Sequence, residues 1–139
     1  SLGEFLALGA SFDDLGAKTG NARAKILGET LDSAIGKLLD ANQSPSRKTG
    51  ELDNRGSQFY LAKHWADELA AQTEDAELAK HFAGLANTLA KNEDVILGEL
   101  NVVQGKAVDI GGYYAPDHDL TSAVMRPSAT LNAAIDAKD

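Results

Sequence analysis

Apolar residues recur at the spacing of an amphipathic helix along the first third of the chain. The first such stretch predicts a helix over 2–16, which glycines at its end stop. The second predicts a helix over 21–41, which stops before the polar run that leads to Pro45. A short turn joins the two, so we expect them to pack antiparallel. The apolar positions are Leu2, Phe5, Leu6, Gly9, Phe12, Leu15, Ala22, Ile26, Leu27, Leu31, Ala34, Ile35, Leu38 and Leu39.

A third helix is predicted over 58–72, after a polar loop at 44–56 that has no sustained period. Ser57 is its predicted N-cap, because a serine hydroxyl accepts hydrogen bonds from the first free N–H groups of a helix. We expect Trp65 to be buried, since it lies on the apolar face of this helix. That face comprises Leu61, Ala62, Trp65, Ala66 and Leu69.

One long helix is predicted over 76–104, because a single apolar stripe continues to Val103 without a proline. Acidic residues before it suit the positive end of the helix dipole. Asn92 provides an alternative, in which it caps a second helix and divides the stretch in two.

The period disappears after Gly105. Residues 106–118 contain Gly-Gly, paired tyrosines and a proline, which predicts an extended segment. Asp119 is expected to cap a short turn up to Met125, and Pro127 to occupy the first position of a helix over 127–136. These patterns predict an all-α fold: an antiparallel bundle of about four to six helices with an irregular C-terminal tail, in a single domain over 1–139.

The composition and net charge of the chain limit the classes of partner that it could bind. The 139 residues include 13 Lys and Arg against 21 Asp and Glu, for a net charge of -8. Such a chain has no net positive field to attract nucleic acid or an anionic membrane, so we expect neither as a partner. No apolar run is long enough to span a bilayer, which favours a cytoplasmic protein.

The first residues favour a piece of a longer protein. The chain begins at Ser1 rather than Met, and its only Met is Met125. Ser1 and Glu4 also form the S-x-x-E pattern of a capping box, which is expected to open the first helix.

Candidate chemistry is sparse. His64 is expected to be a surface or interhelix hydrogen-bonding residue, and His81, four residues after Glu77, a member of a solvated helix face. The cluster 117–119, Asp-His-Asp, is expected to form a turn and a helix cap, because adjacent side chains diverge. No E-x-x-H pair, G-x-S-x-G elbow or phosphate-binding glycine loop occurs. We therefore expect neither catalytic residues nor metal ligands in this chain.

The loop at 44–56 is the exception, because it gathers Arg47, Lys48 and Arg55. Cations, serine hydroxyls and a following helix N-terminus suit a phosphate or a carboxylate. Glu51 and Asp53 lie close in sequence, so local ion pairing is the alternative. Spacing by itself favours the local pairing.

Four segments of the sequence resemble a known enzyme family. They are SPSRKTGELDNRGSQFYLA from residue 44, LAAQTED at 69–75, VQGKAVDIGGYYAPDHDLTSAVMRPSATLNAA at 103–134 and SLGEFLALGASFDDL at the start. They closely resemble the C-terminal region of the monomeric-type NADP-dependent isocitrate dehydrogenases, over essentially the whole chain.

This resemblance implies a part of a large single-chain α/β enzyme that oxidises and decarboxylates isocitrate to 2-oxoglutarate, with NADP and magnesium or manganese. It implies that Arg47 is a cofactor-contacting arginine, and that the metal-binding and substrate-binding residues lie upstream of Ser1. We accordingly expect the isolated chain to be inactive and to hold no bound cofactor. Its expected partner is the remainder of the parent chain. A free-standing helical interaction module, whose basic loop binds an acidic partner, is the alternative.

Overall fold

A computed structural model describes residues 2–137, all of whose regular elements are helices. Seven helices occur in this range, one more than the expected maximum. None of them is long and apolar enough to cross a bilayer. Their bounds are α1 Leu2–Thr19, α2 Ala22–Asp40, α3 Asn54–Ala71, α4 Ala76–Lys91, α5 Glu93–Asn101, α6 His118–Met125 and α7 Ala129–Asp136.

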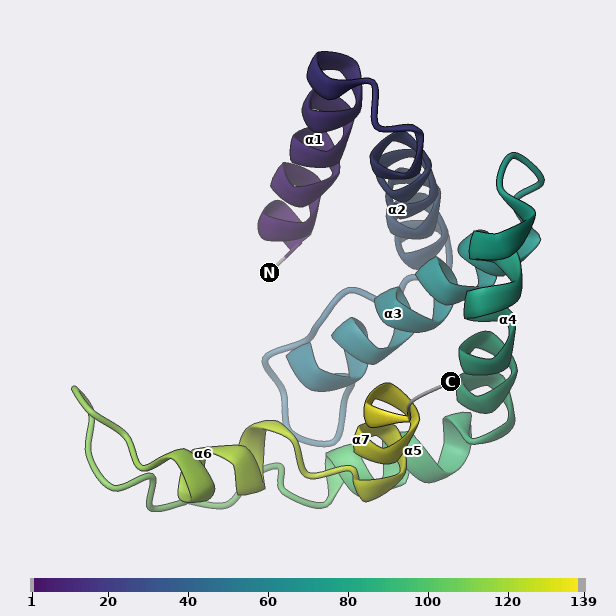
Figure 1. The fold of residues 1–139 in the computed structure, drawn as a ribbon. Coiled ribbons are helices and arrows are strands. Elements are labelled where there is room, and N and C mark those ends of the chain that lie inside the picture. The colour runs from purple at the N-terminus through teal and green to yellow at the C-terminus, as the bar shows by residue number, and fades with distance from the viewer. Residues whose placement is uncertain (1, 138–139) are drawn as a thin grey trace.

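The helices are packed largely in chain order, as expected for a bundle built from short connections. α1 and α2 form an antiparallel hairpin, α3 packs on α2, and α4 packs on α3 (Figure 1). The chain then runs through α5 into a tail over 102–126, which extends away from the other helices before α7 returns to pack on α4 and α5. The all-α fold class is confirmed.

The first two helices match their predicted ranges closely. α1 continues three residues past the expected end, and Asn21 caps α2 by accepting a hydrogen bond from the Ala24 N–H. Ser1, the first residue of the capping box predicted for α1, lies outside the described residues.

The predicted start of the third helix is wrong by four residues. α3 begins at Asn54, and its N-cap is Asp53, whose carboxylate accepts hydrogen bonds from the N–H groups of Arg55 and Gly56. Ser57 instead lies inside the helix, where it is buried and donates its hydroxyl hydrogen to the Gln43 carbonyl at 2.7 Å. Both residue types cap helices well, but only Asp53 also pairs with Arg55.

The single helix predicted over 76–104 is also wrong, and the alternative with a break at Asn92 is correct. Asn92 separates α4 from α5 with φ of -108° and ψ of 13°, outside the helical region. Its side-chain amide donates to the Thr88 carbonyl at 2.8 Å and makes no cap bond to α5. This break accounts for the additional helix.

Both helix starts predicted in the tail are displaced. Asp117, not Asp119, caps α6 by accepting from the N–H groups of Asp119 and Leu120. Ser128, not Pro127, precedes α7, whose first residue is Ala129. Ser128 is 1% exposed and donates to the Glu99 carboxylate, which therefore fastens the start of α7 to α5.

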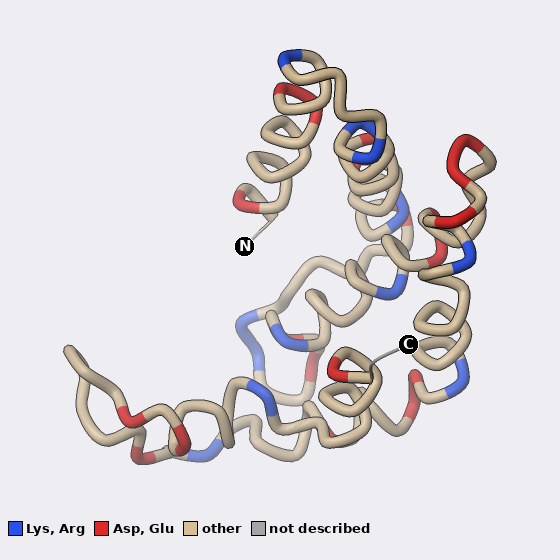
Figure 2. Tube along the Cα trace, in the orientation of Figure 1, with Lys and Arg blue, Asp and Glu red and all other residues tan. Residues whose placement is uncertain are grey.

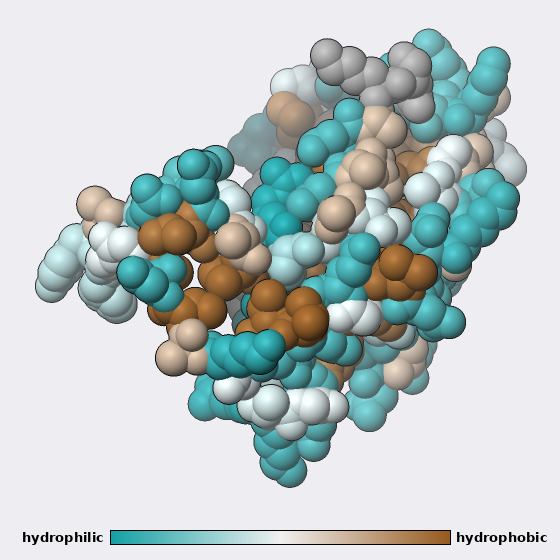
Figure 3. All heavy atoms as spheres, turned by 90° about the horizontal axis from the view of Figure 1, so that it is seen from below, coloured by the Kyte–Doolittle hydropathy of each residue, from teal (hydrophilic) through white to brown (hydrophobic). Residues whose placement is uncertain are grey.

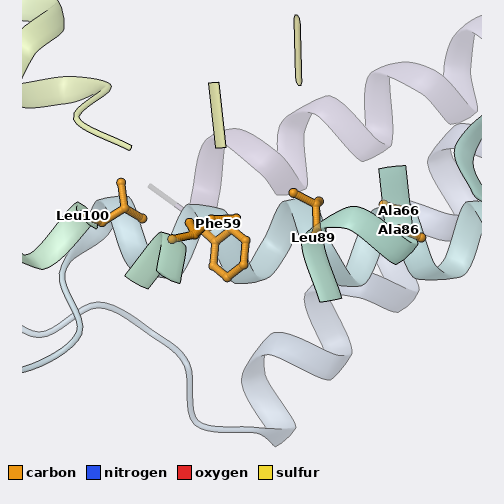
Figure 4. Packing of buried hydrophobic residues seen from close by; sticks show 6 residues of the cluster. Phe59, Ala66, Ala86, Leu89 and Leu100 are labelled. Atoms are coloured by element: carbon orange, nitrogen blue, oxygen red, sulfur yellow. The ribbon is translucent and has the colours of Figure 1, made fainter. Parts of the chain in front are cut away.

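Two apolar clusters form the core. One lies between α3, α4 and α5 and centres on Phe59, Leu89 and Ile96 (Figure 4). The other lies between α2 and α3 and centres on Leu31 and Leu61. In each cluster the residues with the largest apolar side chains have almost no solvent contact, as a folded core requires.

Trp65 is not buried as predicted. It is half-buried against the second cluster, where its ring lies 6.2 Å from that of Phe12 and its Nε1–H donates to the Thr30 hydroxyl at 3.1 Å. Ala62, predicted on the same buried face, is exposed. Phe12 of α1 and Thr30 of α2 both contact the indole, which stays partly exposed.

Candidate functional site

The basic loop predicted from the sequence joins α2 to α3, and we call residues 41–53 the Arg47 loop. It is closed by its own backbone, because the Ser46 N–H donates to the Leu52 carbonyl at 2.7 Å. The Ser46 hydroxyl donates to Glu51 and accepts from the Lys48 N–H. Arg47 lies in the turn that these bonds define.

An open pocket of about 500 Å³, which we call the Arg47 pocket, lies between the Arg47 loop and the chain that leaves α5. The loop forms one wall, with Arg47 and Lys48, and the segment from Val103 to Val108 forms another, with Lys106. Valine and methionine side chains from this segment and from the end of α6 complete the lining. The structure thus brings together cations that are more than fifty residues apart in sequence.

The four cations of the pocket differ in their pairing. Within residues 2–137, no ion pair or hydrogen bond engages the exposed side chains of Arg47 and Lys106. Lys48 lies 3.9 Å from Glu51 at the surface, a pair that contributes little. Arg55 is fully engaged, since it donates to the Asp53 carboxylate at 2.6 Å and to the Val124 carbonyl at 2.7 Å.

Of the two alternatives for the basic loop, local ion pairing is observed at Lys48 and Arg55. Local pairing describes Arg55, which ties the start of α3 to the end of α6. Burial raises the pKa of the Asp53 carboxyl, but the hydrogen bonds and charge of Arg55 and the Gly56 N–H outweigh burial, so this pKa lies below its usual value. Arg47 takes part in no such pair within residues 2–137, so the anion site stays a prediction for this residue.

The Lys and Arg positions of the α2–α3 connection lie on the side of the molecule where the tail runs, as Figure 2 shows. Sequence reasoning identified Arg47 and Lys48 but missed Lys106 and its neighbour Gln104. The Gln104 amide bonds to the loop through the Gly50 N–H at 3.0 Å and the Glu51 carbonyl at 2.9 Å. No local spacing signals this contact, because only the return of the chain after α5 creates it.

The histidines do not gather at this site. His64 bonds through Nε2 to the Gln43 amide oxygen at 2.7 Å, so it forms a hydrogen bond as predicted, but to the Arg47 loop rather than to another helix. Burial, reinforced by Lys63, lowers the pKa of His64 below its usual value. His81 is exposed on α4, and His118 lies at the surface beside Asp119.

Among residues 2–137 no group of three or more His, Asp and Glu side chains has the arrangement needed to hold a metal ion. The Asp117–Asp119 cluster forms a turn and a helix cap, as predicted, with Asp117 as the capping residue. A larger hollow of about 960 Å³ between α4 and α7 is lined mainly by alanine, leucine, phenylalanine and threonine. The Arg47 pocket is therefore the best candidate for binding a charged ligand.

Comparison with known proteins identifies the family of this chain. The family model described as monomeric isocitrate dehydrogenase matches residues 1–136. The chain belongs to the monomeric isocitrate dehydrogenase family. This membership confirms the resemblance seen in the sequence.

Relatives in this family are similar along nearly the whole chain. The NADP isocitrate dehydrogenase 2 of Mycobacterium tuberculosis is 74% identical over 137 residues, which is 99% of this chain and 18% of that protein. The NADP isocitrate dehydrogenase of Azotobacter vinelandii is 61% identical over 135 residues, with 97% and 18% covered. That of Corynebacterium glutamicum is 53% identical over 137 residues, with 99% and 19% covered. This chain thus corresponds to less than a fifth of the length of its isocitrate dehydrogenase relatives.

Proposed function

We propose that this chain is the C-terminal helical part of a cytoplasmic NADP-dependent isocitrate dehydrogenase, and that its Arg47 pocket contacts the cofactor. The observation that carries the proposal is the pairing pattern of the pocket: Arg47 and Lys106 have no partner within the described residues. A guanidinium and an ammonium in one open pocket suit a phosphate group, which accepts charge-assisted hydrogen bonds.

The residues present fit the phosphate-bearing part of NADP. Arg47 and Lys106 supply positive charge, and the valine and methionine side chains of the pocket supply an apolar wall. When bound, NADP supplies the hydride acceptor for the oxidation of isocitrate. In that reaction Arg47 binds and orients and moves no proton, since a guanidinium stays charged.

Magnesium or manganese does not fit this part of the chain, because the described residues offer no group of three acidic or histidine ligands. We therefore assign the metal and the isocitrate-binding groups to the rest of the parent enzyme. An enzyme of this class stabilises the developing enolate electrostatically. We expect the isolated chain to produce no NADPH from isocitrate, and measurable production by the pure chain would contradict this division of roles.

The rest of the parent chain is the proposed partner of the exposed apolar surface. Leu6 and Leu15 of α1 are about half exposed, although they belong to an apolar stripe. Hydrophobic side chains also gather on the face formed by the tail, seen from below in Figure 3. Exposed apolar side chains that gather on one face mark an interaction site in a folded protein.

Substitution of Arg47 in the full-length enzyme tests the cofactor contact. A contact to NADP contributes equally to the ground state and the transition state, so Arg47→Ala should raise KM for NADP and leave kcat nearly unchanged. Loss of a charge-assisted hydrogen bond predicts an increase of about ten- to a hundredfold. Arg47→Lys should keep only part of the affinity that Arg47→Ala loses, because an ammonium lacks the planar fork of the guanidinium.

Arg55→Ala is the matched control, because Arg55 lines the same pocket but is committed to Asp53 and Val124. It should lower stability and change KM for NADP little. If Arg55→Ala weakens NADP binding as much as Arg47→Ala, the loop acts through its overall charge or its folding, and the assignment to Arg47 is wrong. The free-standing module is tested separately by reading the coding sequence upstream of Ser1 for the remainder of a dehydrogenase.

A further inference from the structure

The backbone that carries Arg47 has almost no apolar anchor. Residues 47–51 are all exposed, and Leu52 is the half-buried apolar side chain that follows them. An exposed segment of this kind gains little from burial, so polar contacts must hold its conformation.

One side chain from outside the loop supplies two such contacts. The Gln104 amide oxygen accepts from the Gly50 N–H at 3.0 Å, and its amide nitrogen donates to the Glu51 carbonyl at 2.9 Å. A primary amide carries its donor and acceptor side by side, so Gln104 binds two neighbouring backbone groups as another peptide would.

Gln104 is itself held in place. Its backbone N–H donates to the Asn101 carbonyl at 3.1 Å, which continues the last turn of α5. The next residue, Gly105, has a φ of 68°, and a Cβ there would lie 2.8 Å from the Thr49 methyl carbon. The chain after α5 therefore approaches the Arg47 loop as closely as a glycine permits.

We infer that Gln104 is a positioning residue for cofactor binding, which holds the Arg47 loop so that the Arg47 guanidinium faces the pocket. This inference rests on the proposed role of Arg47. Gln104 also lines the pocket, but its amide is engaged by the Gly50 N–H and the Glu51 carbonyl, so we infer that it acts through the loop backbone. Without it, binding NADP must also order the loop, and this cost weakens affinity.

The test uses the full-length enzyme with Gln104→Met, which keeps the length of the side chain and removes both hydrogen bonds. We expect KM for NADP to rise about three- to tenfold, with kcat and KM for isocitrate unchanged. Gln104→Glu should recover part of the loss, because a carboxylate still accepts from the Gly50 N–H. Asn87→Ala is the control, since Asn87 is an exposed amide on α4, away from the pocket.

A double-mutant cycle separates this inference from the proposed function. If Gln104 acts through Arg47, adding Gln104→Met to Arg47→Ala should raise KM for NADP no further. Arg47→Ala without effect refutes the proposed function itself. Suppose instead that Arg47→Ala has the expected effect. Then an unchanged KM for NADP in Gln104→Met, or fully additive effects in the double variant, refutes only the role of Gln104. A loss of kcat in Gln104→Met refutes that role as well.

Hydrogen exchange of the unsubstituted enzyme tests the inference independently of how the variants fold. Gly50 is an exposed loop residue, but its N–H donates a hydrogen bond to Gln104. This amide should therefore exchange at least about tenfold more slowly than a loop amide without a hydrogen bond. Exchange of Gly50 at the rate of a free amide would overturn the inference.

Discussion

Two irregular segments of this molecule differ sharply in how they are held. The Arg47 loop is tied to α3 through Asp53 and to the turn after α5 through Gln104, and Ser46 closes it internally. The second segment, residues 106–117, which we call the tyrosine loop, is closed mainly on itself. Its Asp117 N–H donates to the Ile110 carbonyl at 2.7 Å, and the Gly111 N–H donates to Asp109 at 2.8 Å.

The difference extends to their side chains. Tyr113 and Tyr114 are 88% and 98% exposed at the tip of the tyrosine loop, where their rings pack edge to face on each other. The Arg47 loop instead exposes charge beside a pocket. A loop that is fixed by the domain and exposes charge is suited to a small ligand, whereas a protruding loop that exposes aromatic rings is suited to a protein surface.

Substitution of the two helix caps should give the largest contrast between the loops. Asp53→Ala removes the cap of α3 and leaves the guanidinium of Arg55 without its carboxylate, so it should lower the free energy of unfolding by about 2–3 kcal/mol. Asp117→Ala removes the cap of α6 in the exposed tail and should cost only about 0.5–1 kcal/mol. Urea unfolding of the chain measures both, and equal losses would show that the tail is as firmly integrated as α3.

These caps also show what sequence could predict. Asp53 and Ser57 are both good capping residues four positions apart, and local propensity does not rank them. The choice depends on Arg55 and on the Gln43 carbonyl that engages Ser57. Helix existence followed from apolar spacing, but the choice between neighbouring capping residues depended on side-chain contacts that local propensity does not include.

The candidate site was predictable to the same degree. Arg47 was found because its charge and its resemblance to a family string lie within one short segment. Lys106 and Gln104 lie on a different segment, and they reach the Arg47 loop only because Asn92 divides the long predicted helix and α5 ends at Asn101. A single helix over 76–104 would have placed these residues elsewhere.

The tyrosine pair should behave differently in the isolated chain and in the full-length enzyme. In the isolated chain, replacing Tyr113 and Tyr114 with Ala should change the free energy of unfolding by less than about 0.5 kcal/mol, because both rings are exposed. If the rest of the enzyme covers them, the same change should destabilise the full-length protein by about 2 kcal/mol. Parallel thermal unfolding of both proteins checks this, and no effect in either would remove the tyrosines from the proposed interface.

A pair of glycines offers a finer comparison, because one packs against the Arg47 loop and the other lies in the tyrosine loop. Gly105 and Gly111 have φ of 68° and 79°, and in each a Cβ would lie 2.8 Å from another side chain. Replacing either with Ala should therefore cost about 1–2 kcal/mol.

The two glycine variants should differ in their effect on cofactor binding. Gly105 contacts Thr49 of the Arg47 loop, so Gly105→Ala should raise KM for NADP in the full-length enzyme. Gly111 contacts Asp117 in the tyrosine loop, so Gly111→Ala should not. Steady-state kinetics measures the difference, and an equal rise in KM for both would mean that general destabilisation, rather than the loop contact, weakens binding.

The smallest expected effect is a pH dependence that belongs to the Arg47 loop. The pKa of Asp53 is lower in the folded chain than its usual value, so the unfolded chain binds its proton more readily. Stability from Asp53 is therefore fully present above the unfolded-state pKa of about 3.9 and is lost as pH falls through the folded-state pKa.

The variant Asp53→Asn has no titrating group at this position. The difference in unfolding free energy between the unsubstituted chain and Asp53→Asn should thus stay constant from about pH 7 to 5 and shrink below about pH 4. Urea unfolding at each pH measures it, and a difference that grows on acidification would show that Arg55 does not stabilise the Asp53 carboxylate.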